Sequence, residues 1–166
     1  MNYMALVKLL VLIDRKALLA FGRPLTGDKI SAMKNGLVLS RVLDFVSQKK
    51  QEKPVSYWHK FISRPAPYVY TVRFSGPADT SALSEAELAL IDEVYSEHRN
   101  KSEWDLSEIH HQLPEWKEAN PGKSSVDIPF ERILELESRS ADQIHSIADE
   151  SLADRAMGAI LEKARK

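Results

Sequence analysis

The segment from Asp14 to Val46 decides the fold, and it reads DRKALLAFGRPLTGDKISAMKNGLVLSRVLDFV. Its first residues continue an apolar helix that we expect over residues 4–20, because good helix formers dominate there. Apolar side chains occupy nearly the whole circumference of that helix, which is typical of a helix buried at the centre of a domain. Gly22 and Pro24 then end the helical pattern. The segment therefore predicts a central core helix followed by a sharp turn.

Short elements separated by turns are expected after the first helix. Residues 29–33 fit either a strand or a helix, and Asn35-Gly36 then requires a turn. Apolar residues at helical spacing predict a helix over residues 37–46. The strongest strand pattern is YVYTVRF at residues 68–74, which is rich in aromatic and β-branched residues. Because one strand cannot stand alone, we expect residues 29–33 to be its partner.

Helices are expected to dominate the rest of the chain. Ser84 and Glu87 have the spacing of a capping box and open a helix that extends to about residue 98. Pro114 fits the first turn of another helix. Further helices are predicted over residues 56–63, 104–111 (with Ser102 as its cap), 128–137, 140–148 and 152–164. We therefore expect a single α+β domain over residues 1–166, predominantly α-helical, with a small two- or three-stranded β-sheet.

Length and composition indicate a globular protein. The chain has 166 residues, of which 43% are hydrophobic and 28% are charged, and it has no cysteine. This composition excludes intrinsic disorder and an integral membrane protein, and it excludes disulfides and cysteine-based metal sites. The longest apolar run near the start, residues 9–13, is too short for a signal peptide or a membrane span. We expect a cytoplasmic protein that does not associate with membranes.

The net charge of −1 conceals an asymmetry along the chain. Residues 1–75 contain 13 Lys and Arg against 4 Asp and Glu, a net charge of +9. Residues 76–166 contain 10 Lys and Arg against 20 Asp and Glu, a net charge of −10. If the two halves form separate faces, a charged protein partner would be attracted. Alternatively, the halves pack together and neutralise each other.

Patterns that would carry catalysis or bind a ligand are weak. The two glycines of residues 22–29 have the spacing of a Walker A loop, but Asp28 stands where the phosphate-binding lysine belongs. A structured turn, with Thr26 or Asp28 capping the element that follows it, explains this segment better. His110 and His111 would point about 100° apart on a helix, so they do not favour a shared metal ion. The pI of about 6.5 argues against a nucleic-acid partner. We predict a protein that is not an enzyme and that uses no metal or cofactor.

Two ordered blocks of residues resemble one known family. Gly22, Arg23, Pro24, Thr26, Gly27 and Asp28 form the first block, and Gly36 and Val38 follow it as part of a Gly-Pro-Val-type step in which Leu37 replaces proline. The second block contains Trp104-Asp105-Leu106 and then His111, Pro114, Glu115 and Trp116, with His110 as an alternative match for the histidine. This order resembles the Panacea domain, the SocA-like antitoxin family that is also described as phage-associated. The resemblance covers about residues 5–145 and leaves residues 146–166 as a C-terminal amphipathic helix.

The resemblance implies a prokaryotic, non-catalytic protein of a toxin–antitoxin system. Such a protein would bind a cognate toxin encoded nearby and neutralise it by direct complex formation. An adaptor that delivers a bound protein to a protease is the main alternative, and a DNA-binding autoregulator is a weaker one. Family members carry a further helix upstream of the first helix predicted here. If that helix is missing, an open apolar groove is expected, which would favour a homodimer or another protein partner.

The resemblance also identifies candidate site residues, which are expected to have structural or partner-binding roles. They are Gly22, Arg23, Gly27, Asp28, Gly36, His111, Pro114 and Trp116. Backbone geometry explains the glycines better than binding does, whereas Trp116 is either a core residue or a partner anchor. Further partner contacts are expected at Trp58 and, in the C-terminal helix, at Leu152 and Ile160.

Overall fold

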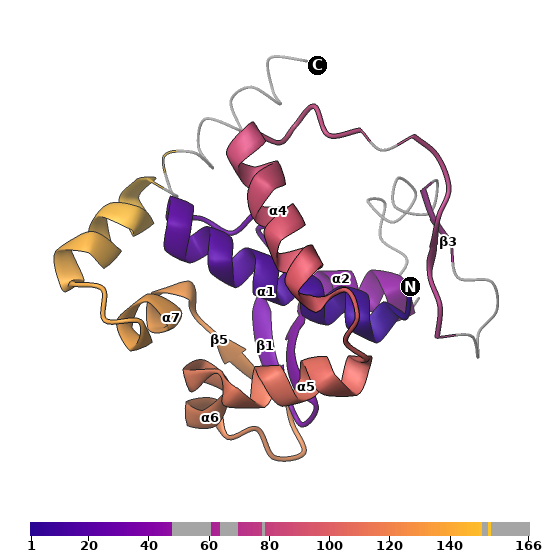
Figure 1. Ribbon diagram of the computed structural model, residues 1–166. Helices are drawn as coiled ribbons and strands as arrows, with labels where there is room; N and C mark the ends of the chain where they lie inside the picture. The colour runs from indigo at the N-terminus through magenta and orange to yellow at the C-terminus, as the bar shows by residue number, and fades with distance from the viewer. Residues whose placement is uncertain (48–60, 64–69, 78, 151–152, 154–166) are drawn as a thin grey trace, which may run out of the picture.

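A long central helix organises the structure. The computed structural model describes residues 1–47, 61–63, 70–77, 79–150 and 153 (Figure 1). Helix α1 (Tyr3–Phe21) begins at Asn2, whose side chain accepts a hydrogen bond from the Met4 amide. It ends at Gly22, which is left-handed and donates its N–H to the Leu18 carbonyl. Buried side chains lie on several sides of α1, so the predicted central core helix is confirmed.

A small antiparallel sheet packs beside α1. Strand β1 (Ile30–Met33) pairs with β2 (Gly36–Leu39) on one edge and with β5 (Val126–Ile128) on the other. Ile30 lies opposite both Leu39 and Ile128 in the register. The turn predicted at Asn35-Gly36 is confirmed, because it joins β1 to β2. The sheet buries Ile30, Leu37 and Leu39 in the same core as Val7 and Val11 of α1.

The helix predicted over residues 37–46 is wrong for its first three residues. Residues 37–39 form β2, and helix α2 (Ser40–Ser47) begins only after them. All of β2 is buried against β1 and α1, and this pairing overrides the helical spacing of its apolar side chains.

The partner predicted for residues 68–74 is also wrong. Both edges of β1 are occupied by β2 and β5, and residues 68–69 lie outside the described residues. Strand β4 (Arg73–Phe74) pairs instead with β3 (Ile62–Ser63), where a helix was predicted over residues 56–63. The remainder of that predicted helix, apart from Phe61, lies outside the described residues.

The later helices largely follow the prediction. Helix α4 (Glu85–His98) opens with the capping box of Ser84 and Glu87, and α5 (Glu103–Gln112) opens with a second capping box at Ser102. Helix α6 (Pro114–Ala119) has Pro114 in its first turn. Helix α7 (Phe130–Leu136) starts later than expected, because Ile128 is taken by β5, which was not predicted.

These elements form a predominantly helical α+β structure, as predicted, in which α1 packs against α4, α5 and β2 (Figure 1). Residues 141–150 are helical, which confirms the helix predicted over residues 140–148. The helix predicted over residues 152–164 lies outside the described residues except for position 153.

Ion pairs join the basic first half of the chain to the acidic second half. The pairs that cross between the halves are Arg15–Glu115 at 2.7 Å, Arg15–Glu137, Lys16–Glu93 at 2.6 Å, Arg23–Glu87 at 2.5 Å and Lys29–Asp127 at 2.5 Å. Glu115 is fully buried, so its pair with Arg15 lies in the interior. Among the described residues, the two halves therefore neutralise each other at these contacts.

Gly36 is the position where a side chain is least tolerable. Its φ angle is 104°, and a Cβ atom there would lie 2.8 Å from Lys8 Nζ and 2.9 Å from His110 Cβ. We expect Gly36→Ala to lower the free energy of unfolding by about 2 kcal/mol or more, through backbone strain and overpacking. Urea denaturation measures this change. Gly122→Ala is the control, because a Cβ atom there would meet nothing within 4 Å. Equal losses in the two variants would contradict the prediction.

Candidate functional site

Asp14 fixes the turn that follows α1. Its side chain is completely buried, and its Oδ1 accepts hydrogen bonds from the backbone amides of Leu25 and Thr26, each at 2.9 Å. The Thr26 hydroxyl donates to Oδ2 of the same carboxylate. Burial raises the pKa of Asp14, although these hydrogen bonds oppose the shift. The central helix thus holds the first block of family-motif residues in place.

Asp28 fixes the other end of this turn. Its carboxylate accepts hydrogen bonds from the amides of Arg41 at 3.2 Å and Val42 at 2.9 Å. These amides lie in the first turn of α2, where they have no partner within the helix. The Asp28 carboxylate also accepts from the Lys29 amide at 2.7 Å. The expectation that Asp28 caps the structure after the turn is confirmed, with α2 as the helix that it caps.

The other motif residues of this turn also have structural surroundings. Gly22 and Gly27 have φ angles of 71° and 60°, which favour glycine. Arg23 Nη2 lies 2.5 Å from Glu87 Oε1 of α4, and the Arg23 side chain is about half exposed. The structure therefore brings Gly22, Arg23, Gly27 and Asp28 together as a scaffold for one turn.

The second group of motif residues surrounds the β1–β2 turn. His111 Nε2 lies 3.2 Å from the Lys34 carbonyl oxygen, and its ring contacts that of Trp116 at a tilt of 31°, with centroids 4.1 Å apart. Trp116 Nε1 donates to the Met33 carbonyl at 2.9 Å. Pro114 opens α6 and so places Trp116 against the hairpin. These contacts, together with the close packing at Gly36, hold the β1–β2 hairpin against α5 and α6.

His110 holds the same hairpin from the inside. It is completely buried, and its Nδ1 accepts a hydrogen bond from the Leu37 amide at 3.2 Å. Burial, together with the positive charge of Lys8, lowers the pKa of His110 to about 3. The two candidate histidines therefore have different roles: His110 binds β2, and His111 binds the turn and Trp116.

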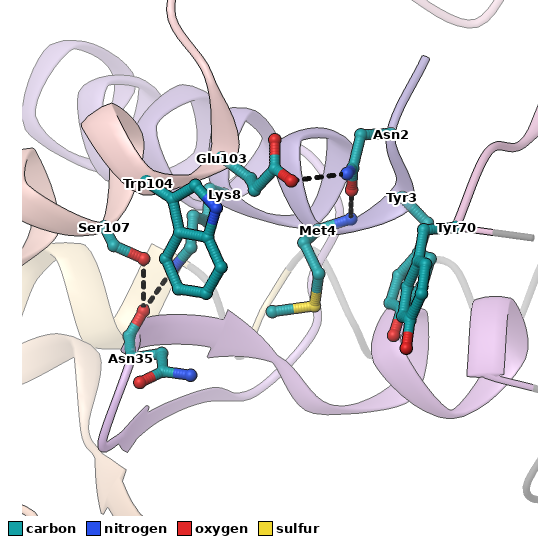
Figure 2. Close-up of a pocket in the computed structure, with 9 residues that line it drawn as sticks. All are labelled: Asn2, Tyr3, Met4, Lys8, Asn35, Tyr70, Glu103, Trp104 and Ser107. Carbon is teal, nitrogen blue, oxygen red and sulfur yellow. Dashed lines mark hydrogen bonds between the residues drawn. The ribbon is translucent and has the colours of Figure 1, made fainter.

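A pocket with aromatic walls opens at the N-terminal end of α1, and we call it the Trp104 pocket (Figure 2). It has a volume of about 370 Å³ and lies between the start of α1, the start of α5, the β1–β2 turn and Tyr70. Its lining residues are Asn2, Tyr3, Met4, Lys8, Asn35, Tyr70, Glu103, Trp104 and Ser107. Tyr3 and Tyr70 stack with centroids 5.8 Å apart, and 68% of Trp104 is exposed.

Lys8 is the unusual residue of this pocket. Only 1% of it is exposed, and its amine donates a hydrogen bond to the Asn35 carbonyl. The Ser107 hydroxyl donates to the same carbonyl at 2.9 Å, as Figure 2 shows. Burial lowers the pKa of Lys8 to about 8. No acidic side chain in the described part of the chain forms an ion pair with Lys8.

The pocket offers binding surfaces rather than a recognisable metal site. Among its described lining residues the one carboxylate is Glu103, which accepts a hydrogen bond from the Asn2 amide group at 2.9 Å. Across the ranges that the structure describes, no three His, Asp or Glu side chains are grouped so that they could hold a metal ion. The same ranges contain no helix long and apolar enough to cross a bilayer.

The Trp104 pocket was not predicted from the sequence. Lys8, Tyr70 and Trp104 were not singled out as site residues, and the expected contacts Trp58, Leu152 and Ile160 lie outside the described residues. A usable signal was present, because Lys8 is a charged residue within an apolar helix. Such a residue indicates either a polar partner or a site.

The buried state of His110 predicts a dependence of stability on pH. Its pKa is about 3 in the folded protein and about 6.5 when unfolded, so the unfolded chain binds the proton more tightly between these values. The stabilising contribution of the neutral ring is therefore lost as the pH falls below 6.5. Between pH 7 and pH 5 we expect His110 to lower the free energy of unfolding by about 2 kcal/mol.

His110→Asn tests this prediction, because an asparagine oxygen can accept the Leu37 amide bond without titrating. Urea denaturation of both proteins at pH 7 and pH 5 gives the difference that His110 causes, since all other groups are shared. The same loss of stability in both proteins would refute the assignment.

A comparison with protein families gave a match over most of the described N-terminal part of the chain. A family model described as antitoxin SocA-like, Panacea domain, matches residues 6–117. Comparisons with curated proteins and with solved structures gave no match. The matched span contains both motif blocks, together with Lys8 and Trp104 of the pocket. Because it covers more than half of the chain, the chain belongs to the antitoxin SocA-like, Panacea domain family.

Proposed function

We propose that this protein is an antitoxin that binds a cognate toxin, encoded by a neighbouring gene, and neutralises it by forming a direct complex. Membership of an antitoxin family across residues 6–117 carries this proposal. Neutralisation would require binding alone, without catalysis, and would take place in the cytoplasm. The toxin is then the protein partner, and no cofactor takes part.

The surface of the protein is large enough for such a complex. A stable interface buries about 800 Å² on each partner, which is less than a tenth of the accessible surface of 10856 Å². Large exposed aromatic side chains often anchor a partner. Trp104 and Tyr70, 68% and 61% exposed, both line the Trp104 pocket. We therefore place the centre of the toxin contact at this pocket, with Trp58, Leu152 and Ile160 as further proposed contacts.

The family-motif residues support this location indirectly. His111 and Trp116 hold the backbone of the β1–β2 turn, and Asn35 of that turn forms one wall of the pocket. A wall that is fixed before binding lowers the entropy lost on binding. In this proposal, the motif residues act as a scaffold and the pocket makes the contact.

Co-expression with the product of the neighbouring gene tests the function. If that product arrests growth on its own, we expect this protein to restore growth and to co-purify with it. A harmless neighbour that does not co-purify would contradict the proposal.

Trp104→Ala tests the location of the contact. We expect it to weaken toxin binding by at least about tenfold, as for an aromatic anchor. Tyr95→Ala is the matched control, since Tyr95 is 45% exposed on α4 and does not line the pocket. Titration calorimetry of both variants gives the comparison, and equal affinities would place the contact elsewhere.

A further inference from the structure

The burial of Lys8 requires an explanation that the fold alone does not give. An ammonium group has three N–H donors, and the described contacts supply one acceptor, the Asn35 carbonyl. That carbonyl already accepts a hydrogen bond from Ser107. Burying a charge without an opposite charge costs stability. The burial of Lys8 therefore lowers the stability of the fold by more than its one hydrogen bond to this turn restores.

Lys8 differs in this respect from Glu115, Glu87 and Asp14, which are also buried charged groups in the part of the chain that the structure describes. Glu115 is paired with Arg15 at 2.7 Å, and Glu87 is paired with Arg23 at 2.5 Å. Asp14 accepts three hydrogen bonds. Lys8 has no carboxylate partner among the described residues, and it lines the Trp104 pocket.

We propose that the Trp104 pocket recognises an aspartate or glutamate side chain of the toxin that is flanked by an apolar residue. Because only 1% of Lys8 is exposed, the carboxylate would bind in the pocket beside the buried ammonium group, and the apolar neighbour would pack on Trp104 and Met4. Charge complementarity determines this choice of occupant, because an apolar side chain would leave the ammonium without a counter-charge. This inference rests on the proposed antitoxin function and specifies the chemistry of the partner.

Glu103 should have the opposite effect to Lys8 on the binding of a carboxylate. Its carboxylate also lines the pocket and is held by the Asn2 amide group at 2.9 Å. An incoming carboxylate would be attracted by Lys8 and repelled by Glu103. Neutralising Glu103 should therefore strengthen binding, whereas neutralising Lys8 should weaken it.

Lys8→Met is the decisive variant. Methionine keeps the apolar stem of the side chain, and Ser107 still satisfies the Asn35 carbonyl, so we expect the variant to fold with unchanged or greater stability. Binding of the purified toxin at pH 7 should weaken at least tenfold. Glu103→Gln should bind a few-fold more tightly than the wild type. Lys16→Met is the matched control: it removes the same charge from the same helix, at a residue paired with Glu93, and should bind like the wild type.

The pH dependence separates a charge effect from a loss of packing. Lys8 has a pKa of about 8 in the free protein, and a bound carboxylate would raise it. Wild-type binding should therefore be strong at pH 7 and about tenfold weaker at pH 9, where most of the free protein has lost the Lys8 proton. Glu103, Tyr3 and Tyr70 also line the pocket, and His110 lies next to Gly36. These groups are present in Lys8→Met as well, so a flat profile in that variant would assign the effect to Lys8.

Two results would overturn the inference while leaving the antitoxin function intact. Lys8→Met could bind the toxin as tightly as the wild type or more tightly, which would indicate an apolar occupant. Alternatively, the pH profiles of the two proteins could be the same.

If no toxin binds at all, the proposed function fails, and the pocket is then tested on its own with 3-phenylpropionate and its neutral amide. The carboxylate should shift the indole N–H resonance of Trp104, identified by its loss in Trp104→Phe. The amide should not shift this resonance, and Lys8→Met should abolish the response. Equal responses to the two compounds, or no response to either, would overturn the inference.

Discussion

The structure depends on the way α1 satisfies the charged side chains that it buries. Asp14 accepts three hydrogen bonds from the turn that follows the helix, and Lys8 donates to the turn between β1 and β2. Each group would be costly to bury without its partner, so each one ties a distant turn to the central helix. The first of these turns leads to β1 and supplies the cap of α2, and the second joins the strands β1 and β2. The turn after α1, and with it the start of α2, thus depends on the buried carboxylate of Asp14. The β1–β2 turn that Lys8 contacts is also held by Ser107, His111 and Trp116.

Features encoded by neighbouring residues were predictable from the sequence. The helix of residues 3–21, the capping boxes at Ser84 and Ser102, and the turn at Asn35-Gly36 depend on residues no more than a few positions apart. Each has its own chemical signal, such as a serine three positions before an acidic residue. Local rules were sufficient for these elements because distant parts of the chain do not compete with them.

Features that depend on distant pairing were not predictable. Residues 37–39 have the spacing of a helix, but they form β2 because β1 offers a complete edge and the strand is buried on all four of its residues. Strand β5 pairs with β1 across more than 90 residues of chain, and its three residues carry no strong strand pattern. The Trp104 pocket has the same origin, since it combines the start of α1, Asn35, Tyr70 and the start of α5. No periodicity in the sequence brings these positions together.

The motif residues and the pocket have separate tasks, and Lys8 connects them. Gly36, His111 and Trp116 hold the β1–β2 hairpin close to α1 and α5. The Asn35 carbonyl of that hairpin is therefore close enough to accept a hydrogen bond from the Lys8 amine. One carbonyl holds the ammonium in position without neutralising its charge. The free protein therefore carries a fixed, almost completely buried cation in the wall of the Trp104 pocket, where its attraction for a carboxylate is greater than at an open surface. A salt bridge formed there would lose less side-chain entropy than one formed by an exposed lysine, because burial has already restricted the Lys8 rotamers.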